Sequence, residues 1–335
     1  MSTQFIGLKM GSINTSIFKA GNGLVLKEAS LIAMPTNPKN KEVYAVGENA
    51  KKIRDRLPQN IMVYSPITNG VIQYEDLALL MLRSFIKKVF PNKSFGQNIK
   101  AIVCTPVGLS PEEKKTLELT CYKAGIADVY LVPEVFCLAI GTGIDIQSEK
   151  ANMIVDIGGN ITDIAIISNY NIISAYSISI GGAIINSAII KYINETYKII
   201  ISNEQAEQIK IEVCSLIENY YASIDVDGFN YTTNTKESIT ITSSELYPII
   251  EHYYGKIATI INSVIKDSDP QVIADITETG IHFFGEASSM IGLDKFFQKN
   301  TSFKIDLVNS PNSNMIGTGE LIKYPQLLHK IIKKL

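Results

Sequence analysis

The stretch Ile154–Ser168, IVDIGGNITDIAIIS, decides how the chain is interpreted. Two runs rich in β-branched residues flank Gly158, Gly159 and Asn160, which predicts two strands joined by a tight bend. Two adjacent glycines remove the side chains from the bend, so another group can approach its backbone closely. Backbone N–H groups exposed at such a bend can bind an anion, and we expect phosphate oxygens to meet them here.

The N-terminal segment repeats this pattern. Residues 8–17 align with residues 155–164 without a gap. The two copies share a glycine, a threonine and a following turn cluster: Gly11 with Gly158, Thr15 with Thr162, and 21–23 with 169–171. One supersecondary unit used twice explains this, and two such bends facing each other would hold a polyphosphate between two lobes. Chance likeness is the alternative, because strand–glycine–strand units are common. Neither a Walker loop nor a GxGxxG fingerprint is present.

Length and composition suit a chain of two domains. It has 335 residues, 46% of them hydrophobic, and a formal charge of −2. This near-neutral balance argues against a nucleic-acid-binding protein, which usually carries a basic excess. The four cysteines form no Cys-x-x-Cys pair and the three histidines lie far apart, so we expect reduced thiols in a cytosolic protein and no zinc site. No charged and apolar leader opens the chain, so we expect no signal peptide.

One long uncharged stretch, residues 164–190, raises the question of a membrane span. A spanning helix needs about 20 mostly apolar residues. Asparagines, serines and a Gly-Gly pair interrupt this run, which favours a strand, a turn, a second strand and the start of a helix.

Elsewhere the periodicity predicts alternating strands and helices. Ser110, Pro111 and Glu113 form the expected start of one helix, with a capping box. Further helices are predicted near 75–90, 135–144, 182–195, 203–220, 244–266 and 314–324, and strands near 99–107, 128–134, 223–242, 280–284 and 302–308. This alternation predicts an α/β protein with mostly parallel sheets.

Six motifs along nearly the whole chain carry a resemblance to a known family. They are GNGLVLKEASLIA (21–33), SPITNGVIQYEDLALLMLRSFIKKV (65–89), YLVPEVFCLAIGTGI (130–144), IVDIGGNITDIAIIS (154–168), AEQIKIE (206–212) and IGTGELI (316–322). Together they resemble the actin-like ATPase superfamily and, within it, the bacterial MreB family. The resemblance is specific because all six stand in the family's order.

The resemblance implies an α/β, actin-like two-lobed fold with a duplicated strand–helix core around a central nucleotide cleft. Lobe I would comprise residues 1–145 and 310–335, with a small insert subdomain at about 33–65. Lobe II would comprise residues 146–309, with an insert subdomain at about 182–243. The cofactors implied are ATP or ADP with Mg²⁺.

The resemblance also assigns residues to the nucleotide site. The first phosphate hairpin would be Ser12, Ile13 and Asn14, and the second Gly158, Gly159 and Asn160. The nucleoside would be held by Glu207 and Lys210, which share one face of a predicted helix, together with the intervening Gln208 and Ile209. A glycine turn under the nucleotide would be Gly285, Glu286, Ala287 and Ser288. The catalytic residues implied are Glu134, which would polarise the attacking water, Asp156 near the magnesium, and Thr162.

Three positions depart from the family pattern. Lys9 stands where an aspartate is usual, so it cannot hold a magnesium shell and would itself pair with phosphate. Ile161 replaces a threonine that could hydrogen-bond the attacking water, and Thr162 remains as a partial substitute. Glu286 interrupts a glycine triplet and adds a negative charge. We therefore expect nucleotide binding with slow or weak hydrolysis.

The function implied is an ATP-binding bacterial actin-like cytoskeletal protein that polymerises into double filaments in the cytoplasm, on the inner face of the membrane, and does not bind nucleic acid. One alternative is a hydrolysis-deficient, nucleotide-bound scaffold that assembles with a paralogue. Another is an enzyme resembling the sugar or acetate kinases of the same superfamily. A chaperone ATPase would need a further peptide-binding domain.

Two segments bear on membrane binding. Phe95 sits where family members present a hydrophobic membrane loop, although one phenylalanine contributes about 2 kcal/mol at most. The C-terminal segment 325–335 alternates apolar residues with lysines, which is typical of a basic interfacial helix. The alternative is a final helix packed on the first lobe, with its lysines near the negative helix end.

Overall fold

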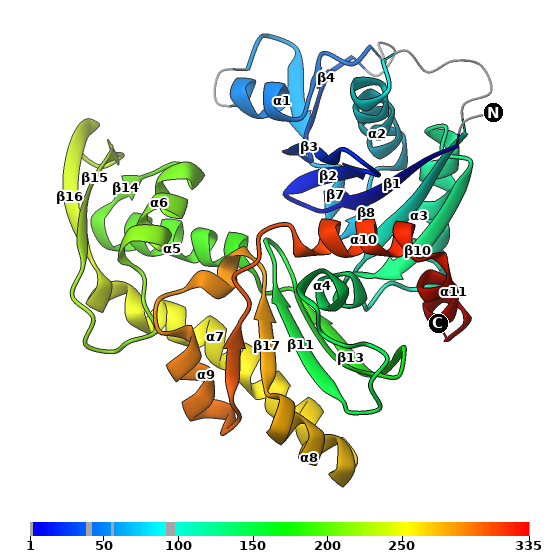
Figure 1. The fold of residues 1–335 in the computed structure, drawn as a ribbon. Helices are drawn as coiled ribbons and strands as arrows, with labels where there is room; N and C mark the ends of the chain where they lie inside the picture. The colour runs from blue at the N-terminus through cyan, green and yellow to red at the C-terminus, as the bar shows by residue number, and fades with distance from the viewer. Residues whose placement is uncertain (1–2, 38–41, 55–56, 92–97, 335) are drawn as a thin grey trace. The chain divides into compact units, whose positions relative to one another are not determined.

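The computed structural model describes residues 3–37, 42–54, 57–91 and 98–334 (Figure 1). Its internal contacts divide the chain into two compact units. The first consists of Met1–Glu149, Ile167–Ser177 and Ser310–Leu335, and the second of Lys150–Ile166 and Ile178–Asn309. Each unit buries its own hydrophobic core.

A five-stranded sheet forms the centre of the first unit. Its order is β10 (Asp128–Pro133), β9 (Asn98–Thr105), β1 (Thr3–Met10), β2 (Asn14–Lys19) and β3 (Gly23–Ala29). β1 pairs antiparallel with β2 and parallel with β9, and β9 pairs parallel with β10. The apolar run of β9 is almost completely buried, as expected for a strand covered on both faces.

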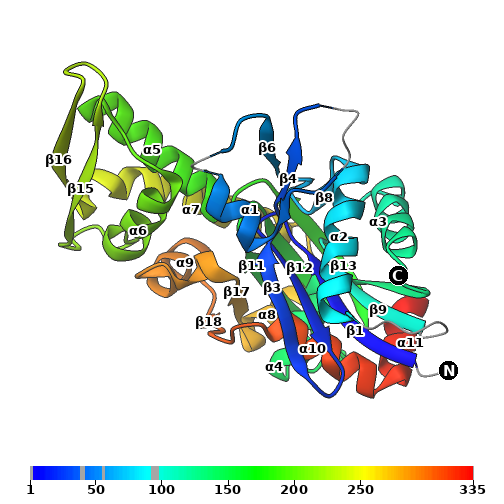
Figure 2. The same cartoon turned by 90° about the horizontal axis from the view of Figure 1, so that it is seen from above.

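A second five-stranded sheet has the same plan (Figure 2). Its order is β18 (Ile305–Leu307), β17 (Ile281–Phe284), β11 (Asn152–Ile157), β12 (Thr162–Ser168) and β13 (Asn171–Ile178). β11 pairs parallel with β17, and β17 with β18, as β1 pairs with β9 and β9 with β10. The predicted internal repeat is confirmed strand by strand, and chance likeness does not explain it.

The first unit adds helices and two small sheets to its central sheet. The helices are α1 (Glu48–Ile53), α2 (Glu75–Val89), α3 (Pro111–Lys123), α4 (Glu134–Thr142), α10 (Ser313–Lys323) and α11 (Pro325–Lys334). The small sheets contain β4 (Ile32–Pro35), β5 (Ala45–Val46) and β6 (Ile61–Tyr64), and β7 (Ile67–Thr68) and β8 (Val71–Ile72). The predicted capping box of α3 is confirmed, because Ser110 Oγ accepts from Glu113 N at 3.2 Å and Glu113 Oε2 accepts from Ser110 N at 2.7 Å.

The second unit contains a small three-stranded sheet and several helices. They are α5 (Gly182–Tyr197), β14 (Ile199–Ile200), α6 (Asn203–Val213), β15 (Ser223–Asn230), β16 (Thr235–Thr242), α7 (Ser243–Lys266), α8 (Pro270–Thr279), the 3₁₀ helix Glu286–Ser289 and α9 (Leu293–Thr301). The predicted helix over 203–220 is wrong beyond Val213. Cys214 is extended there, and Leu216 N donates to Ile291 O at 2.8 Å, so the chain leaves the helix to make a tertiary bond.

Helices α4 and α10 cross in direct backbone contact within the first unit. A Cβ atom added at Gly317 would lie 1.9 Å from Cys137 O, and one added at Gly141 would lie 1.9 Å from Ser313 O. Glycines at the crossing therefore allow the helices to approach closely. The approach brings the first turn of α10 to the first residue of α4, Glu134.

The C-terminal helix α11 packs its apolar face on the first unit. Leu328 and Ile331 are buried, whereas the neighbouring Ile332 is 38% exposed. α11 contacts α10 and β10, which supports the packed-helix alternative for this segment. The predicted membrane-loop residue Phe95 lies outside the described residues. Among the described residues, no helix is long and apolar enough to cross a bilayer, and residues 164–190 form the predicted strands and helix start.

If α11 is a packed structural element, its buried face should carry the stability. Ile331→Ala should lower the free energy of unfolding by about 2–3 kcal/mol, because it leaves a cavity in a core position. Ile332→Ala, one residue along the same helix, should cost under about 1 kcal/mol. Urea unfolding of both variants measures the difference, and equal losses would contradict the packed arrangement.

Candidate functional site

The first glycine bend joins β1 to β2. Gly11 N donates to Asn14 O at 3.1 Å, which closes the turn. Ser30, which lies between β3 and β4, supports this turn. Its backbone N donates to Ile13 O at 2.8 Å, and its Oγ donates to Gly11 O at 2.5 Å. The predicted phosphate residues Ser12, Ile13 and Asn14 therefore lie on a bend braced by hydrogen bonds to neighbouring chain.

The second bend joins β11 to β12 and has the same closing bond. Gly158 N donates to Ile161 O at 2.9 Å, and Ile161 aligns with Asn14 in the repeat. Gly182 N donates to Gly158 O at 3.0 Å and Ala183 N to Gly159 O at 2.7 Å. The start of α5 thus fixes the bend, which includes the predicted Asn160.

A third turn, at Gly285, lies directly against the end of β11. Gly285 has a φ of +91°, and a Cβ atom there would lie 2.2 Å from Ile157 O and 2.6 Å from Asp156 Oδ1. A side chain at this position would therefore collide with the strand that carries Asp156. Ala287 and Ser288 are buried in the 3₁₀ helix that follows, with Ser288 Oγ donating to Gly285 O at 2.7 Å, whereas Glu286 lies at the surface.

The predicted nucleoside pair is formed in the second unit. Lys210 Nζ lies 2.8 Å from Glu207 Oε2, and the two residues share one face of α6. Lys210 is only 8% exposed, and its Nζ also lies 3.4 Å from Gly182 O at the start of α5. Asn186 of α5, which the sequence did not single out, donates from Nδ2 to Glu207 Oε2 at 2.6 Å.

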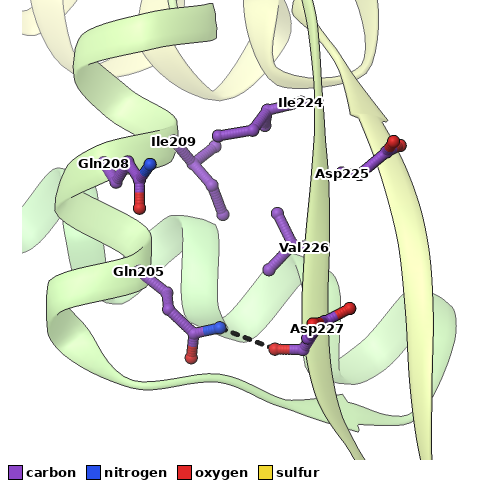
Figure 3. Close-up of a pocket in the computed structure, with 7 residues that line it drawn as sticks. All are labelled: Gln205, Gln208, Ile209, Ile224, Asp225, Val226 and Asp227. Atoms are coloured by element: carbon purple, nitrogen blue, oxygen red, sulfur yellow. Dashed lines mark hydrogen bonds between the residues drawn. The ribbon is translucent and has the colours of Figure 1, made fainter.

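Gln208 and Ile209 lie between Glu207 and Lys210 in α6 but take part in a separate cavity. Both line a cavity of about 290 Å³ between α6 and β15 whose lining does not include Glu207 or Lys210 (Figure 3). Ile209 is buried and points toward the strand, and Gln208 Nε2 bonds Glu212 Oε1 at 3.0 Å. Gln205 Nε2 donates to Asp227 O at 2.6 Å across this cavity. The cavity is lined by Gln205, Gln208, Ile209, Ile224, Asp225, Val226 and Asp227. The structure therefore places Gln208 and Ile209 at a cavity that Glu207 and Lys210 do not line, and their contact with a nucleoside stays a prediction.

The predicted catalytic Glu134 begins α4 in the first unit and is only 6% exposed. Its Oε1 accepts from Lys9 Nζ at 2.5 Å and from Asn314 Nδ2 at 2.6 Å. Lys9 was expected to pair with phosphate, and here it pairs with this carboxylate. The neighbouring Cys104 thiol is neutral, because a hydrogen bond to Cys137 and burial raise its pKa well above the usual value.

Two further catalytic predictions lie in the second unit. Asp156 is buried near the end of β11 beside the Gly285 turn. Thr162 is completely buried, and its Oγ1 donates to Ile180 O at 2.7 Å. The hydroxyl of Thr162 is therefore buried and bonded within the second unit, which argues against its predicted role with the attacking water.

Among the residues that the structure describes, no three His, Cys, Asp or Glu side chains gather into a protein-only metal site. Mg²⁺ at nucleotides usually needs only one or two carboxylates, with phosphates and water as the other ligands. Asp156 can supply one carboxylate, whereas Lys9 in the first copy of the repeat cannot. The residues thus fit a magnesium held mainly by the phosphates.

Several known proteins resemble this chain along nearly its whole length. A family model described as MreB/Mbl protein matches residues 3–330. The cell shape-determining protein Mbl of Bacillus subtilis (strain 168) is 31% identical over 324 residues, which are 96% of this chain and 96% of that protein. The cell shape-determining protein MreB of Escherichia coli (strain K12) is 30% identical over 314 residues, 93% of this chain and 90% of that protein.

Solved structures of three-dimensional folds similar to this one are also known. MreB5 of Spiroplasma citri matches with a TM-score of 0.87 bound to AMPPNP, at 25% identity over 100% of both chains. Bound to ADP it matches with a TM-score of 0.88, at 26% identity over 98% of both chains. The MamK double helical filament matches with a TM-score of 0.80 at 17% identity, over 96% of this chain and 99% of that one, which supports the fold alone.

Proposed function

The chain belongs to the MreB/Mbl family, and from this premise we propose that it is an ATP-binding, actin-like cytoskeletal protein that self-associates into filaments. The actin-like α/β fold agrees with that of MreB5, whose structures contain AMPPNP and ADP. Mbl and MreB, which share most of this chain's length, are described as cell shape-determining proteins. These relatives support a cytoskeletal role, which we place in the cytoplasm as part of this proposal.

The duplicated bend is the observation that supports nucleotide binding most directly. In each copy the amide of the aligned glycine, Gly11 or Gly158, closes the turn on the carbonyl three residues later. Such bends present backbone N–H groups that suit phosphate oxygens. Glu207 and Lys210 would hold the nucleoside, and Asp156 would hold the Mg²⁺ that neutralises the phosphates.

Slow hydrolysis is part of this proposal. Phosphoryl transfer to water needs a group that orients the water and accepts its proton. The Thr162 hydroxyl already donates a hydrogen bond to Ile180 O, and Ile161 has no hydroxyl. The Glu134 carboxylate already accepts from two donors. We expect turnover roughly 100- to 1000-fold below that of a relative with the usual residues, since losing an oriented water or charge stabiliser costs a few kcal/mol.

The second candidate function is a nucleotide-bound scaffold that no longer hydrolyses ATP and assembles with a paralogue. The substitutions at Lys9, Ile161 and Glu286 favour it. Peripheral binding to the inner membrane face is a further part of the proposal. It depends on the exposed face of α11, because the opposite face is packed in the first unit.

Electron microscopy of the purified protein with ATP, with ADP and without nucleotide tests these functions. We expect filaments whose abundance depends on the nucleotide, and phosphate release that is slow beside a relative with the usual residues. Filaments that appear only after a paralogue is added would support the scaffold. Turnover equal to that of the relative would refute slow hydrolysis, and absence of binding to any adenine nucleotide would refute the proposed function itself.

A further inference from the structure

Two donors from different parts of the first unit converge on one carboxylate oxygen. Lys9 approaches Glu134 Oε1 from β1, and Asn314 approaches the same atom from the first turn of α10. Lys9 and Glu134 are 125 positions apart, and Asn314 and Glu134 are 180 apart. The close crossing of α4 and α10 holds Asn314 at this point, so the contact is built into the packing of the unit.

The Lys9 side chain also passes the first glycine bend. A Cβ atom added at Gly11 would lie 3.6 Å from Lys9 Cε. The ammonium that pairs with Glu134 is therefore carried next to the bend proposed to hold phosphate. This places the ion pair within the part of the unit where ATP would react.

The burial of the carboxylate distinguishes this ion pair from ordinary surface pairs. The side chains of Lys9 and Glu134 are 30% and 8% exposed. In the Lys100–Asp128 pair of the same sheet, the lysine is also 30% exposed, but the carboxylate is 45% exposed. Solvent screens a surface pair strongly, whereas a buried carboxylate depends on its protein partners.

We propose that Lys9 is a positioning residue that restrains Glu134 and thereby slows ATP hydrolysis, an inference that rests on the proposed function. In the reaction, a water oxygen forms a bond to the terminal phosphorus, and the bridging P–O bond breaks with its electron pair going to ADP. The water's proton leaves through the general base, so that ATP and water give ADP, inorganic phosphate and a proton. A carboxylate already neutralised by an ammonium polarises that water less than a free one.

Neutral substitutions of Lys9 test the restraint. Lys9→Gln retains an N–H donor for the buried carboxylate, and Lys9→Met retains the length of the side chain without its charge. Both should raise phosphate release at saturating ATP by about tenfold or more, which is a part of the roughly 100- to 10,000-fold that a general base contributes. Lys9→Arg keeps the charge and should retain the wild-type rate. Thermal melting of each variant establishes that it is folded.

The increase in the rate of phosphate release must depend on Glu134 if Lys9 acts through this carboxylate. Adding Glu134→Gln to Lys9→Gln should abolish the increase, and the matched control Lys100→Gln should leave the rate unchanged. An unchanged rate in both neutral variants, or a gain that survives Glu134→Gln, would overturn the proposal. Weaker binding of an ATP analogue at unchanged turnover would also overturn it, because Lys9 would then be a phosphate ligand. Analogue binding and filament formation by the wild-type protein separate these outcomes from failure of the proposed function.

Discussion

Replacing Gly317 by valine is expected to unfold the first unit at temperatures where the wild-type protein is stable. A Cβ atom at this position would lie 1.9 Å from Cys137 O and 2.7 Å from Cys137 C, which are backbone atoms of α4. Backbone cannot rotate away as a side chain tip can, so α4 and α10 would have to separate. We expect a loss of about 4 kcal/mol or more, which belongs to the largest effects of single substitutions.

A helical glycine in open space provides the control. Gly255 lies within α7, and a Cβ atom there would meet nothing within 4 Å. Gly255→Ala should stabilise the protein by about 0.5–1 kcal/mol, because alanine restricts the unfolded chain and suits a helix. Thermal and urea unfolding measure both variants. If Gly317→Val melted with the wild type, the backbone contact between the two helices would be wrong.

Local sequence patterns predicted the repeat and the order of helices and strands, because short segments of the sequence determine both. Alternation of apolar residues, glycine bends and caps such as Ser110 depend on neighbours in sequence. The contact at Gly317 depends on residues of α4 far back in the chain. IGTGELI therefore predicted a helix correctly without indicating which backbone that helix would touch.

The candidate site shows the same division between local and distant information. The family resemblance assigned Glu207 and Lys210 to the nucleoside, their helical spacing placed them on one face, and they form an ion pair. Gln208 and Ile209 lie between them in sequence, but a helix points successive residues in different directions, and both line a separate cavity. The Lys9–Glu134 pair could not be predicted, since neither residue carries a local signal for the other.

The direction of the Thr162 side chain argues against its predicted role for a different reason. It was proposed as a substitute for a hydroxyl missing one position earlier. Successive residues of a strand point to opposite faces of the sheet, so a shift of one position reverses the direction of the side chain. Thr162 accordingly turns into the fold and bonds Ile180 O.

Replacing Lys210 by methionine is expected to lower the affinity for adenine nucleotides by on the order of a hundredfold. Lys210 Nζ joins Glu207 Oε2 at 2.8 Å to Gly182 O at 3.4 Å, and Gly182 N bonds Gly158 O in the second bend. The ammonium thus connects the proposed nucleoside pair to the proposed phosphate bend. The lysine is buried, although Glu207 is 45% exposed. A hydrogen bond to a charged group contributes about 1.5–3 kcal/mol, and the upper value corresponds to roughly a hundredfold.

Methionine retains the length and bulk of lysine, so the loss should appear in binding more than in folding. Lys191→Met on α5 is the matched control, because that side chain is 73% exposed and its Glu195 partner lies 3.8 Å away at the surface. Titration with a fluorescent ATP analogue measures both variants, and thermal melting without nucleotide shows that each is folded. Wild-type affinity in Lys210→Met would remove Lys210 from the nucleotide site. It would leave the duplicated bends as the remaining support for binding, because their closing bonds at Gly11 and Gly158 do not involve the Lys210 ammonium.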